Sequence, residues 1–241
     1  MKRIFAMLTT ICALSAFSQE ASADFFPASD AFFKAWVDIY GNVNYAGIKA
    51  APDRLNELVT KIGVYDYRAS TGNTRKAFLI NAYNILMIKS IVDNYPVAKP
   101  TDIEGVFDRR THNVGGQQIT LSDIENKMLR VEFPDARIHF ALVCGAVSCP
   151  QLMNSAYMPT TLDQQLQSRT IKTLNDRNFI RLNVLTSTVE FSQIFEWYKD
   201  DFLKESKNYI EFVNKYRTTK VPALYKETTY PYDWSLNQKR N

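Results

Sequence analysis

The sequence predicts an α+β fold, a mostly helical single domain with short antiparallel strands and hairpins packed around a buried central helix. Three observations lead to this class. Residues 75–92 are apolar nearly all round, which is typical of a helix buried on most sides. Two hairpin candidates follow, at 113–121 and 179–191. Helices and strands do not alternate as βαβ units require, so a parallel wound sheet is excluded.

The first 23 residues have the pattern of a secretory signal peptide. A basic start, Met1 to Arg3, precedes a short apolar run from Ile4 to Phe17 and an Ala-Ser-Ala exit at 21–23. The run is shorter than the ~20 residues needed to span a bilayer. We therefore expect cleavage after Ala23 and export of residues 24–241 as one soluble domain. The expected destination is the periplasm or the external medium, and the alternative is an uncleaved anchor.

Composition limits the partners of the exported chain. The formal net charge of the full chain is only +4, and loss of residues 1–23 would make it +3. Lys and Arg form no cluster with interleaved aromatic residues. Nucleic acid is therefore not expected as a partner. No later segment is long and apolar enough to span a membrane, and no phosphate-binding loop or HExxH motif is present. We expect no cofactor; a small molecule or peptide remains a possible ligand, and protein partners stay undefined.

Helix signals divide the first half of the chain. Ser29 or Asp30 is expected to cap a helix that runs through Trp36. Pro52 is suited to open a second helix, because its fixed backbone angle fits the first turn. The strongest helix is expected from Arg75 to Val92.

Turn and capping signals organise the middle of the chain. Gly115-Gly116 is a two-residue hairpin signal within 113–121. Ser122-Asp123-Ile124-Glu125 has the spacing of a capping box, which predicts a helix from Asp123 to Arg130. Apolar residues on both faces of 137–143 predict a central buried strand that carries His139.

The last third is predicted to hold two helices, a hairpin and a docked tail. Thr160 or Thr161 is expected to begin a helix that ends near Asn175, and residues 179–191 form the second hairpin. Ser192 is expected to cap a helix through Phe202. The tail 230–234 is turn-like but rich in aromatic residues, so we expect it to pack on the domain.

Five polar residues are candidates for a functional site. His139, Cys144 and Cys149 lie within eleven residues of an otherwise apolar segment, 137–150. Asn81 and Asn84 are three residues apart, and therefore share one face of the buried helix. Buried imidazole and amide groups need hydrogen-bond partners. Together these residues predict a polar pocket where helix 75–92 meets segment 137–143; the alternative is a network that only fixes packing.

Several motifs in the same order resemble a known family, the domain of unknown function 547. The resemblance rests on Ala77–Asn84, Leu121–Glu125, Arg137–Gly145, Ser148–Pro150 and Tyr232–Asn237. It extends over nearly all of the exported chain and implies a bacterial exported protein with plant relatives. Some members are fused to glutaredoxin-like modules, a weak indication of thiol chemistry. The family has no established activity, so the resemblance implies no catalytic residues.

One hypothesis for the segment is a thiol-dependent hydrolase or acyl transferase of the papain or transglutaminase type. Cys149 or Cys144 would be the nucleophile and His139 the base, with Asn81, Asn84, Glu125 or Asp233 orienting it (the last two have simpler uses in a cap and a turn). His139 and Cys144 would be ~16 Å apart on opposite faces of a continuous strand, so the pair requires a turn. Pro150 is suited to begin a helix, which would place Cys149 at a helix N-terminus and favour its thiolate.

Two other hypotheses compete with the thiol enzyme. In an exported protein, Cys144 and Cys149 are expected to form a disulfide, which would make the chain a non-catalytic envelope binding or structural protein. A reversible disulfide would combine the two ideas. A metal site of His112, His139, Cys144 and Cys149 is the weakest hypothesis, because the cysteine spacing is unlike that of zinc sites; we expect no metal.

Overall fold

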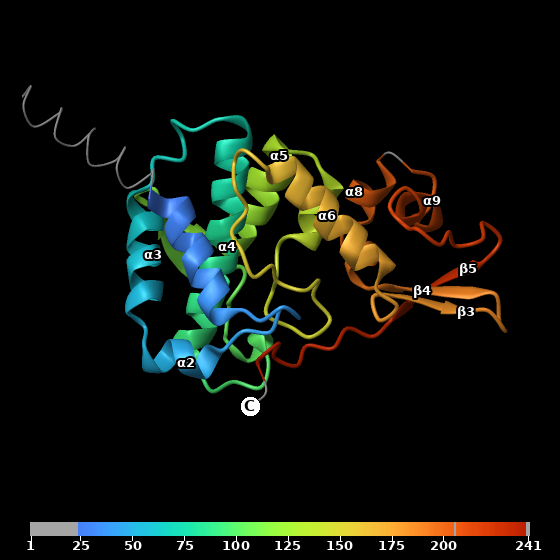
Figure 1. Cartoon of the computed structure of the whole chain (residues 1–241), viewed down its shortest axis with the longest axis horizontal. Coiled ribbons are helices and arrows are strands. Elements are labelled where there is room, and N and C mark those ends of the chain that lie inside the picture. Colours follow the sequence, from blue (N-terminus) through green and yellow to red (C-terminus); the bar gives the residue numbers. More distant parts are fainter. Residues whose placement is uncertain (1–23, 205, 240–241) are drawn as a thin grey trace, which may run out of the picture.

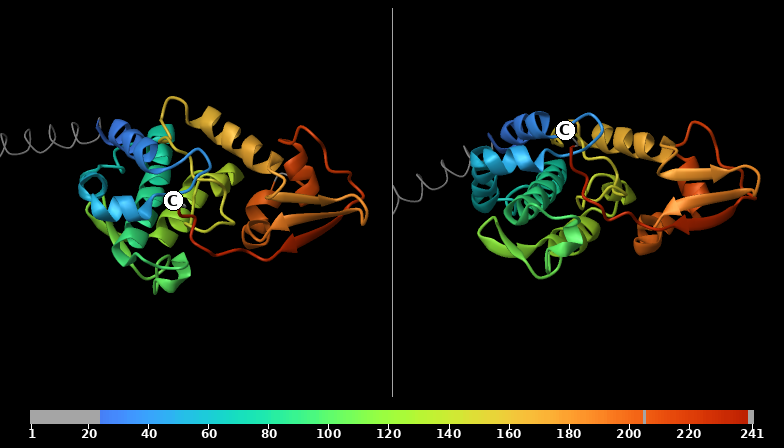
Figure 2. Two further views of the ribbon diagram at one scale, coloured as in Figure 1. Left: turned by 60° about the horizontal axis from the view of Figure 1, so that its bottom comes forward. Right: turned by 90° about the horizontal axis from the view of Figure 1, so that it is seen from below.

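The protein is α+β, as the sequence predicts. The computed structural model describes residues 24–204 and 206–239. Most helices are gathered in one body, and a small sheet with two short helices lies at one end of the molecule (Figure 1). The turned views show the same division, with helix α6 (Leu162–Asn175) and the C-terminal tail running between the two parts (Figure 2). The expected signal peptide, residues 1–23, lies outside the described residues.

Helix α4 (Gly72–Asn94) is the centre of the helical body, as predicted for 75–92. Its side chains from Lys76 to Ile88 are all buried. Helices α2 (Tyr45–Ala50) and α3 (Asp53–Val64) pack against it. Because α4 is enclosed on nearly all sides, its polar residues at 81 and 84 are held inside the protein.

The N-terminal helix covers residues 24–36 and begins before the predicted cap. The prediction of Ser29 or Asp30 as the cap is wrong, since the Ser29 hydroxyl donates to the Phe25 carbonyl inside the helix (2.8 Å). The prediction at Pro52 is confirmed, because α3 begins at the next residue. Helix α2 was not predicted; the side chain of Asn44 caps it by accepting from the Gly47 amide.

The first hairpin is confirmed. Strands β1 (Thr111–Val114) and β2 (Gln117–Thr120) are antiparallel. Gly115 and Gly116 have φ values of 57° and 80°, which are the left-handed values of the tight hairpin turn.

The helix predicted from Asp123 to Arg130 is present in a different form. Residues Asp123–Leu129 are π-helical, and a short helix α5 (Arg130–Glu132) continues them. The cap is Thr120 instead of Ser122: its hydroxyl accepts from the Asp123 amide, and the Asp123 carboxylate accepts from the Thr120 amide. Glu125 lies in this wider, π-helical turn. Such turns are frequent at functional sites.

The predicted strand at 137–143 is wrong. Residues Ala136–Phe140 form a 3₁₀ helix, which the Asp135 side chain caps by accepting from the Arg137 amide. Beyond this helix, the side chain of Asn84 donates a hydrogen bond to the Ala141 carbonyl and accepts one from the Val143 amide. These backbone groups therefore need no neighbouring strand, although the segment is as buried as a central strand.

The C-terminal third contains more structure than was predicted. Helix α6 and the hairpin of β3 (Ile180–Asn183) and β4 (Thr188–Ser192) are confirmed. The expected helix through Phe202 is two short ones, α7 (Ile194–Trp197) and α8 (Lys199–Leu203). Helix α9 (Tyr209–Asn214) and strand β5 (Lys226–Tyr230) were missed, and β5 pairs parallel with β4, so the strands are not all antiparallel.

The aromatic tail packs on the helical body, as predicted. The amides of Val147 and Ser148 donate to the tail carbonyls of Ser235 and Asp233, and the Asn237 amide donates to the Gly145 carbonyl. Farther along, the Tyr45 hydroxyl donates to the Asn237 side chain (2.8 Å). The tail therefore fixes the loop that contains both cysteines.

A partly buried group of ion pairs, Asp135 with Lys76 and Arg137, lies at the start of the 3₁₀ helix. Burial raises the pKa of Asp135, but hydrogen bonds from Arg137 and Lys76 lower it to about 2. This pKa lies below the unfolded value, so the pairing stabilises the fold above about pH 4, and the stability is lost as the pH falls toward 2. At about 1.4 kcal/mol per pKa unit, roughly 2 kcal/mol is involved.

We expect Asp135→Asn to remove this part of the acid dependence, measured as the free energy of unfolding by urea between pH 7 and pH 2. The exposed Asp108→Asn is the matched control and should leave the wild-type slope unchanged. Equal slopes for the Asp135 variant and the wild type would contradict the assignment.

A candidate site beside the cysteine loop

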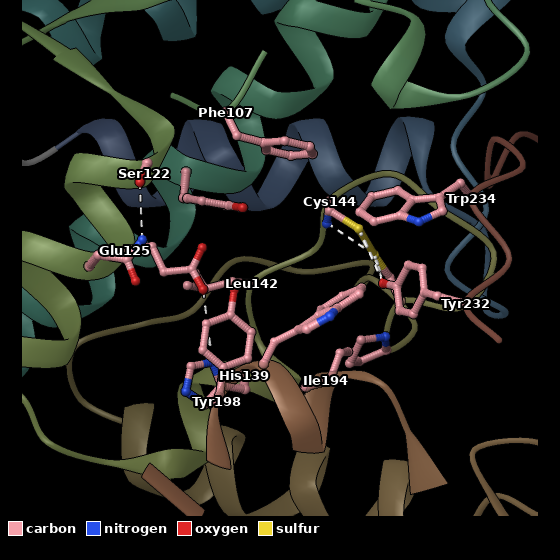
Figure 3. Close-up of a pocket in the computed structure, with 15 residues that line it drawn as sticks. Phe107, Ser122, Glu125, His139, Leu142, Cys144, Ile194, Tyr198, Tyr232 and Trp234 are labelled. Carbon is pink, nitrogen blue, oxygen red and sulfur yellow. Dashed lines mark hydrogen bonds and ion pairs between the residues drawn. A yellow bond between two sulfur atoms is a disulfide. The ribbon is translucent and has the colours of Figure 1, made fainter. Parts of the chain in front are cut away.

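A cavity of about 320 Å³ lies between the cysteine loop, the π-helical turn and the C-terminal tail (Figure 3). Its polar lining includes Glu125 and His139, and Cys144 and Cys149 form another part of its wall. Much of the remaining lining is aromatic: Tyr83, Phe107, Trp197, Tyr198, Tyr232 and Trp234. An apolar cavity with a few convergent polar groups is the usual form of a small-molecule site.

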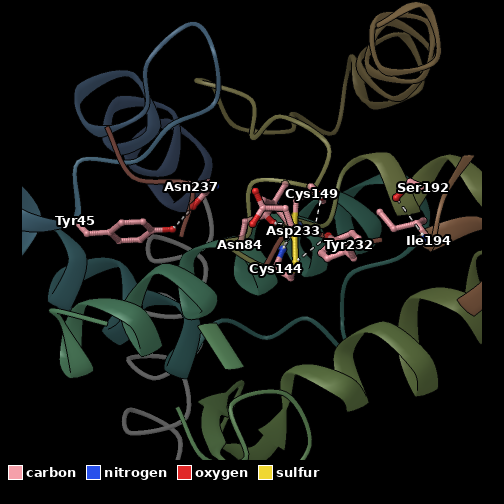
Figure 4. The surroundings of a disulfide bond; sticks show 11 residues. Tyr45, Asn84, Cys144, Cys149, Ser192, Ile194, Tyr232, Asp233 and Asn237 are labelled. Atoms are coloured by element: carbon pink, nitrogen blue, oxygen red, sulfur yellow. Dashed lines mark hydrogen bonds between the residues drawn. A yellow bond between two sulfur atoms is a disulfide. The ribbon is translucent and has the colours of Figure 1, made fainter. Parts of the chain in front are cut away.

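The sulfur atoms of Cys144 and Cys149 are at disulfide distance, with their Cα atoms 6.4 Å apart (Figure 4). The backbone amide of Cys144 donates to Cys149 Sγ (3.1 Å), and the Tyr232 hydroxyl donates to the same sulfur (3.1 Å). The hydroxyl is also 3.3 Å from Cys144 Sγ. Burial raises the pKa of Tyr232, so its phenol keeps the proton that it donates. Two donors therefore converge on Cys149.

The turn that brings the two cysteines together depends on Gly145. Its φ of 81° is a left-handed value that L side chains rarely adopt, and a β-carbon there would lie 2.5 Å from Ile91 Cδ1. Because this turn reverses the chain, Cys149 returns toward Cys144 and both sulfurs reach the cavity.

His139 lies on the other side of the cavity, beside Glu125 and Tyr198 (Figure 3). Its Nε2 is 2.7 Å from Asp201 Oδ2, and Arg130 Nε is 2.6 Å from the same oxygen. Hydrogen bonds from His139 and Arg130 hold the pKa of Asp201 well below its usual range, so this carboxyl is ionised. The imidazole of His139 stacks on the ring of Tyr198, with 3.9 Å between the ring centroids.

Glu125 is a buried carboxylate beside this imidazole. Its Oε1 is 3.9 Å from His139 Nδ1, and its side chain is 10% exposed. Burial, and then the charge of Glu125, raise the pKa of both Tyr83 and Tyr198, which hydrogen-bond to it. Both phenols therefore remain protonated and donate to the carboxylate.

The two asparagines are buried as predicted, but their amides bind backbone and do not line the cavity. Asn81 donates to the Tyr157 carbonyl (2.8 Å) and accepts from the Tyr157 amide (2.9 Å). Asn84 makes the same pair of bonds to Ala141 and Val143, at 2.9 Å each. Asn84 therefore positions the segment between His139 and Cys144, whereas Asn81 positions the chain at Tyr157.

The predicted residues are thus brought together only in part. His139, Cys144, Cys149 and Glu125 share one cavity, but the imidazole is hydrogen-bonded to Asp201 and lies beside Glu125, whereas the sulfurs contact Tyr232. Asp233 is exposed and accepts from the Ser235 amide (2.9 Å), which is a turn contact. His112 lies 3.4 Å from Ser90 Oγ.

Sequence reasoning missed Asp201, Tyr83, Tyr198 and the two tryptophans of the cavity. Asp201 is 62 residues from His139, and no spacing in the sequence connects them. Within residues 24–204 and 206–239, no group of three or more His, Cys, Asp or Glu residues could hold a metal ion. No helix of that part is long and apolar enough to cross a bilayer.

Comparison with known proteins gives one family match. Residues 67–172 match the family described as "Protein of unknown function, DUF547". The matched span includes Glu125, His139 and both cysteines, whereas Asp201 and Tyr232 lie beyond it. No curated protein and no solved structure matches the chain.

Proposed function

The family that residues 67–172 match is described only as one of unknown function, and we therefore propose a function from the cavity itself. The cavity carries out thiol-dependent acyl transfer or hydrolysis on a small molecule or peptide. Cys149 is the nucleophile once a dithiol reductant has opened the disulfide, and Cys144 is its resolving partner.

One observation carries this proposal: Cys149 Sγ accepts hydrogen bonds from the Cys144 amide and the Tyr232 hydroxyl at the wall of the cavity. The thiolate is the reactive form of cysteine, and hydrogen bonds to a charged group favour that form. A reduced Cys149 would therefore be held as a thiolate that faces a bound molecule.

The reaction balances without a cofactor. The thiolate attacks the carbonyl carbon of an ester or amide, the C–S bond forms, and the leaving group departs with its electron pair and a proton. Water or a second substrate then attacks the thioester, and the thiolate is released. The attacking group gives its proton to solvent, which replaces the proton that the leaving group took. Asn84 acts as a positioning residue through the backbone of Ala141 and Val143.

The test is covalent labelling of the purified protein by 4-nitrophenyl acetate. We expect rapid nitrophenol release and an acetyl group on Cys149, located by peptide mass spectrometry, only after reduction by a dithiol. Cys149→Ser should abolish the adduct, whereas Cys144→Ser should form it without reductant. Reduced protein that stays unlabelled, or labelling that survives Cys149→Ser, would refute the proposal.

Tyr232→Phe gives the graded version of this test. Loss of one hydrogen bond to a charged sulfur, at about 1.5–3 kcal/mol, should slow labelling roughly 10–100-fold. Tyr230→Phe is the control, because its hydroxyl donates to the Phe179 carbonyl outside the cavity. Equal rates for Tyr232→Phe and wild type would show that the hydroxyl does not act on the sulfur.

The second candidate is a non-catalytic binding or structural protein, and the closed Cys144–Cys149 pair favours it. An oxidised cysteine is no nucleophile, and disulfides persist in exported compartments, the location we propose for this chain. The labelling experiment decides between the two candidates, because this alternative predicts no adduct under any redox condition.

A further inference from the structure

The cavity has a negative charge that its own lining does not balance. Glu125 is buried, and no Lys or Arg is among the residues that line the cavity. Arg130 does not line the cavity; its Nε donates to Asp201 and its Nη1 to Asn126 Oδ1 (2.8 Å). Arg130 is therefore paired directly with Asp201, and no cation among the lining residues pairs directly with Glu125.

Between Glu125 and His139 there are more hydrogen-bond acceptors than donors. The ionised Asp201 can only accept, so His139 Nε2 carries the proton of their 2.7 Å hydrogen bond. In a neutral imidazole the other nitrogen, Nδ1, is then an acceptor. This Nδ1 is buried and has no hydrogen-bond partner, and it is 3.9 Å from Glu125 Oε1, a second acceptor. Two acceptors that face each other need a donor from elsewhere.

We propose that a primary ammonium group of the ligand binds between Glu125 and His139 Nδ1. An ammonium brings three N–H donors and one positive charge, and so it satisfies both acceptors and balances the carboxylate. An anionic group would meet the Glu125 charge in a buried place, and a hydroxyl would satisfy hydrogen bonds but not the charge. The aromatic lining, with Trp197 and Trp234, suits an apolar body attached to the amine.

This inference assigns the substrate class, and in that respect it rests on the proposed thiol function. Glu125 and His139 lie on one side of the cavity and Cys144 with Tyr232 on the other (Figure 3). A substrate would therefore place its amine at Glu125 and its acyl carbon at the sulfur. Binding of the amine itself does not require a reduced cysteine.

The test is calorimetric titration of the oxidised protein with 4-phenylbutylamine, 4-phenylbutanol and 4-phenylbutanoate, which share one skeleton and differ in the terminal group. We expect the amine to bind at least about 10-fold more tightly than the alcohol, and the carboxylate more weakly than both. Glu125→Gln should make amine and alcohol equal. Glu104→Gln, an exposed carboxylate paired with Arg109, should keep the preference.

The three probes separate an ammonium site from a merely apolar cavity. Equal binding of amine and alcohol to the wild type, or binding of none of the three probes, would overturn it without any variant. That result is also expected if His139 is protonated and pairs with Glu125 itself. A preference for the amine in a protein that cannot be acylated on Cys149 would support the ammonium site and refute the thiol function, so the two failures are distinguishable.

Discussion

Asn84→Leu is expected to lower the free energy of unfolding by about 2–6 kcal/mol. Asn84 is 2% exposed and bonds both the Ala141 carbonyl and the Val143 amide. Leucine has a similar size but no hydrogen-bonding group, so two buried backbone groups would lose their partners at ~1–3 kcal/mol each. The measurement is urea unfolding followed by circular dichroism.

The matched control lies on the same helix. Asn73 is exposed near the start of α4, and Asn73→Leu should change stability by no more than about 0.5 kcal/mol. Loss of these bonds in the Asn84 variant should also loosen residues 141–143 and expose the cysteine loop, which would be measured as faster reduction of the disulfide by a dithiol. If the two leucine variants are equally stable, the Asn84 amide does not hold this segment.

Gly145→Ala is expected to cost about 2–5 kcal/mol and to disturb the cysteine loop. The left-handed backbone at φ 81° accounts for ~1–2 kcal/mol of this in a residue with a β-carbon. That carbon would lie 2.5 Å from Ile91 Cδ1 and 3.3 Å from Pro100 Cγ, and overpacking of this kind adds about 1–3 kcal/mol. The unfolding free energy and the rate of Cys149 labelling after reduction measure the two effects.

Gly116→Ala separates backbone strain from the clash. Gly116 has nearly the same φ, 80°, but a β-carbon there has no atom within 4 Å. It should lose only the strain, about 1–2 kcal/mol, and label at the wild-type rate. Equal losses for the two alanine variants would mean that the packing against Ile91 adapts at no cost.

Features with a local physical cause were predictable from the sequence. The apolar circumference of α4 requires burial wherever the helix lies, and Gly115-Gly116 gives a tight turn by backbone freedom alone. The closeness of Cys144 and Cys149 follows in part from their separation of five residues and from Gly145.

The segment 137–143 could not be predicted, because its backbone partners are distant in sequence. An apolar run of this length suits a buried strand, and nothing nearby indicates that Asn84 replaces a neighbouring strand. The parallel pairing of β5 with β4 is of the same kind, since it joins residues about 38 apart.

The pairing of side chains in the cavity could not be predicted from the sequence either. His139 and the cysteines were expected to be partners because they are neighbours along the chain, but the imidazole is engaged by Asp201 from α8 and the sulfurs by Tyr232 from the tail.

The fold class, the buried central helix, the hairpins and the short list of polar residues in an apolar interior were predictable, since each follows from composition, periodicity or turn chemistry within a few residues. Which of these polar residues face the cavity, which bind backbone, and which acids and phenols join them depend on the folded arrangement of the chain. Hydrogen bonds and charges act over a few ångströms, and only folding brings Glu125, Asp201 and Tyr232 within that range of His139 and Cys149.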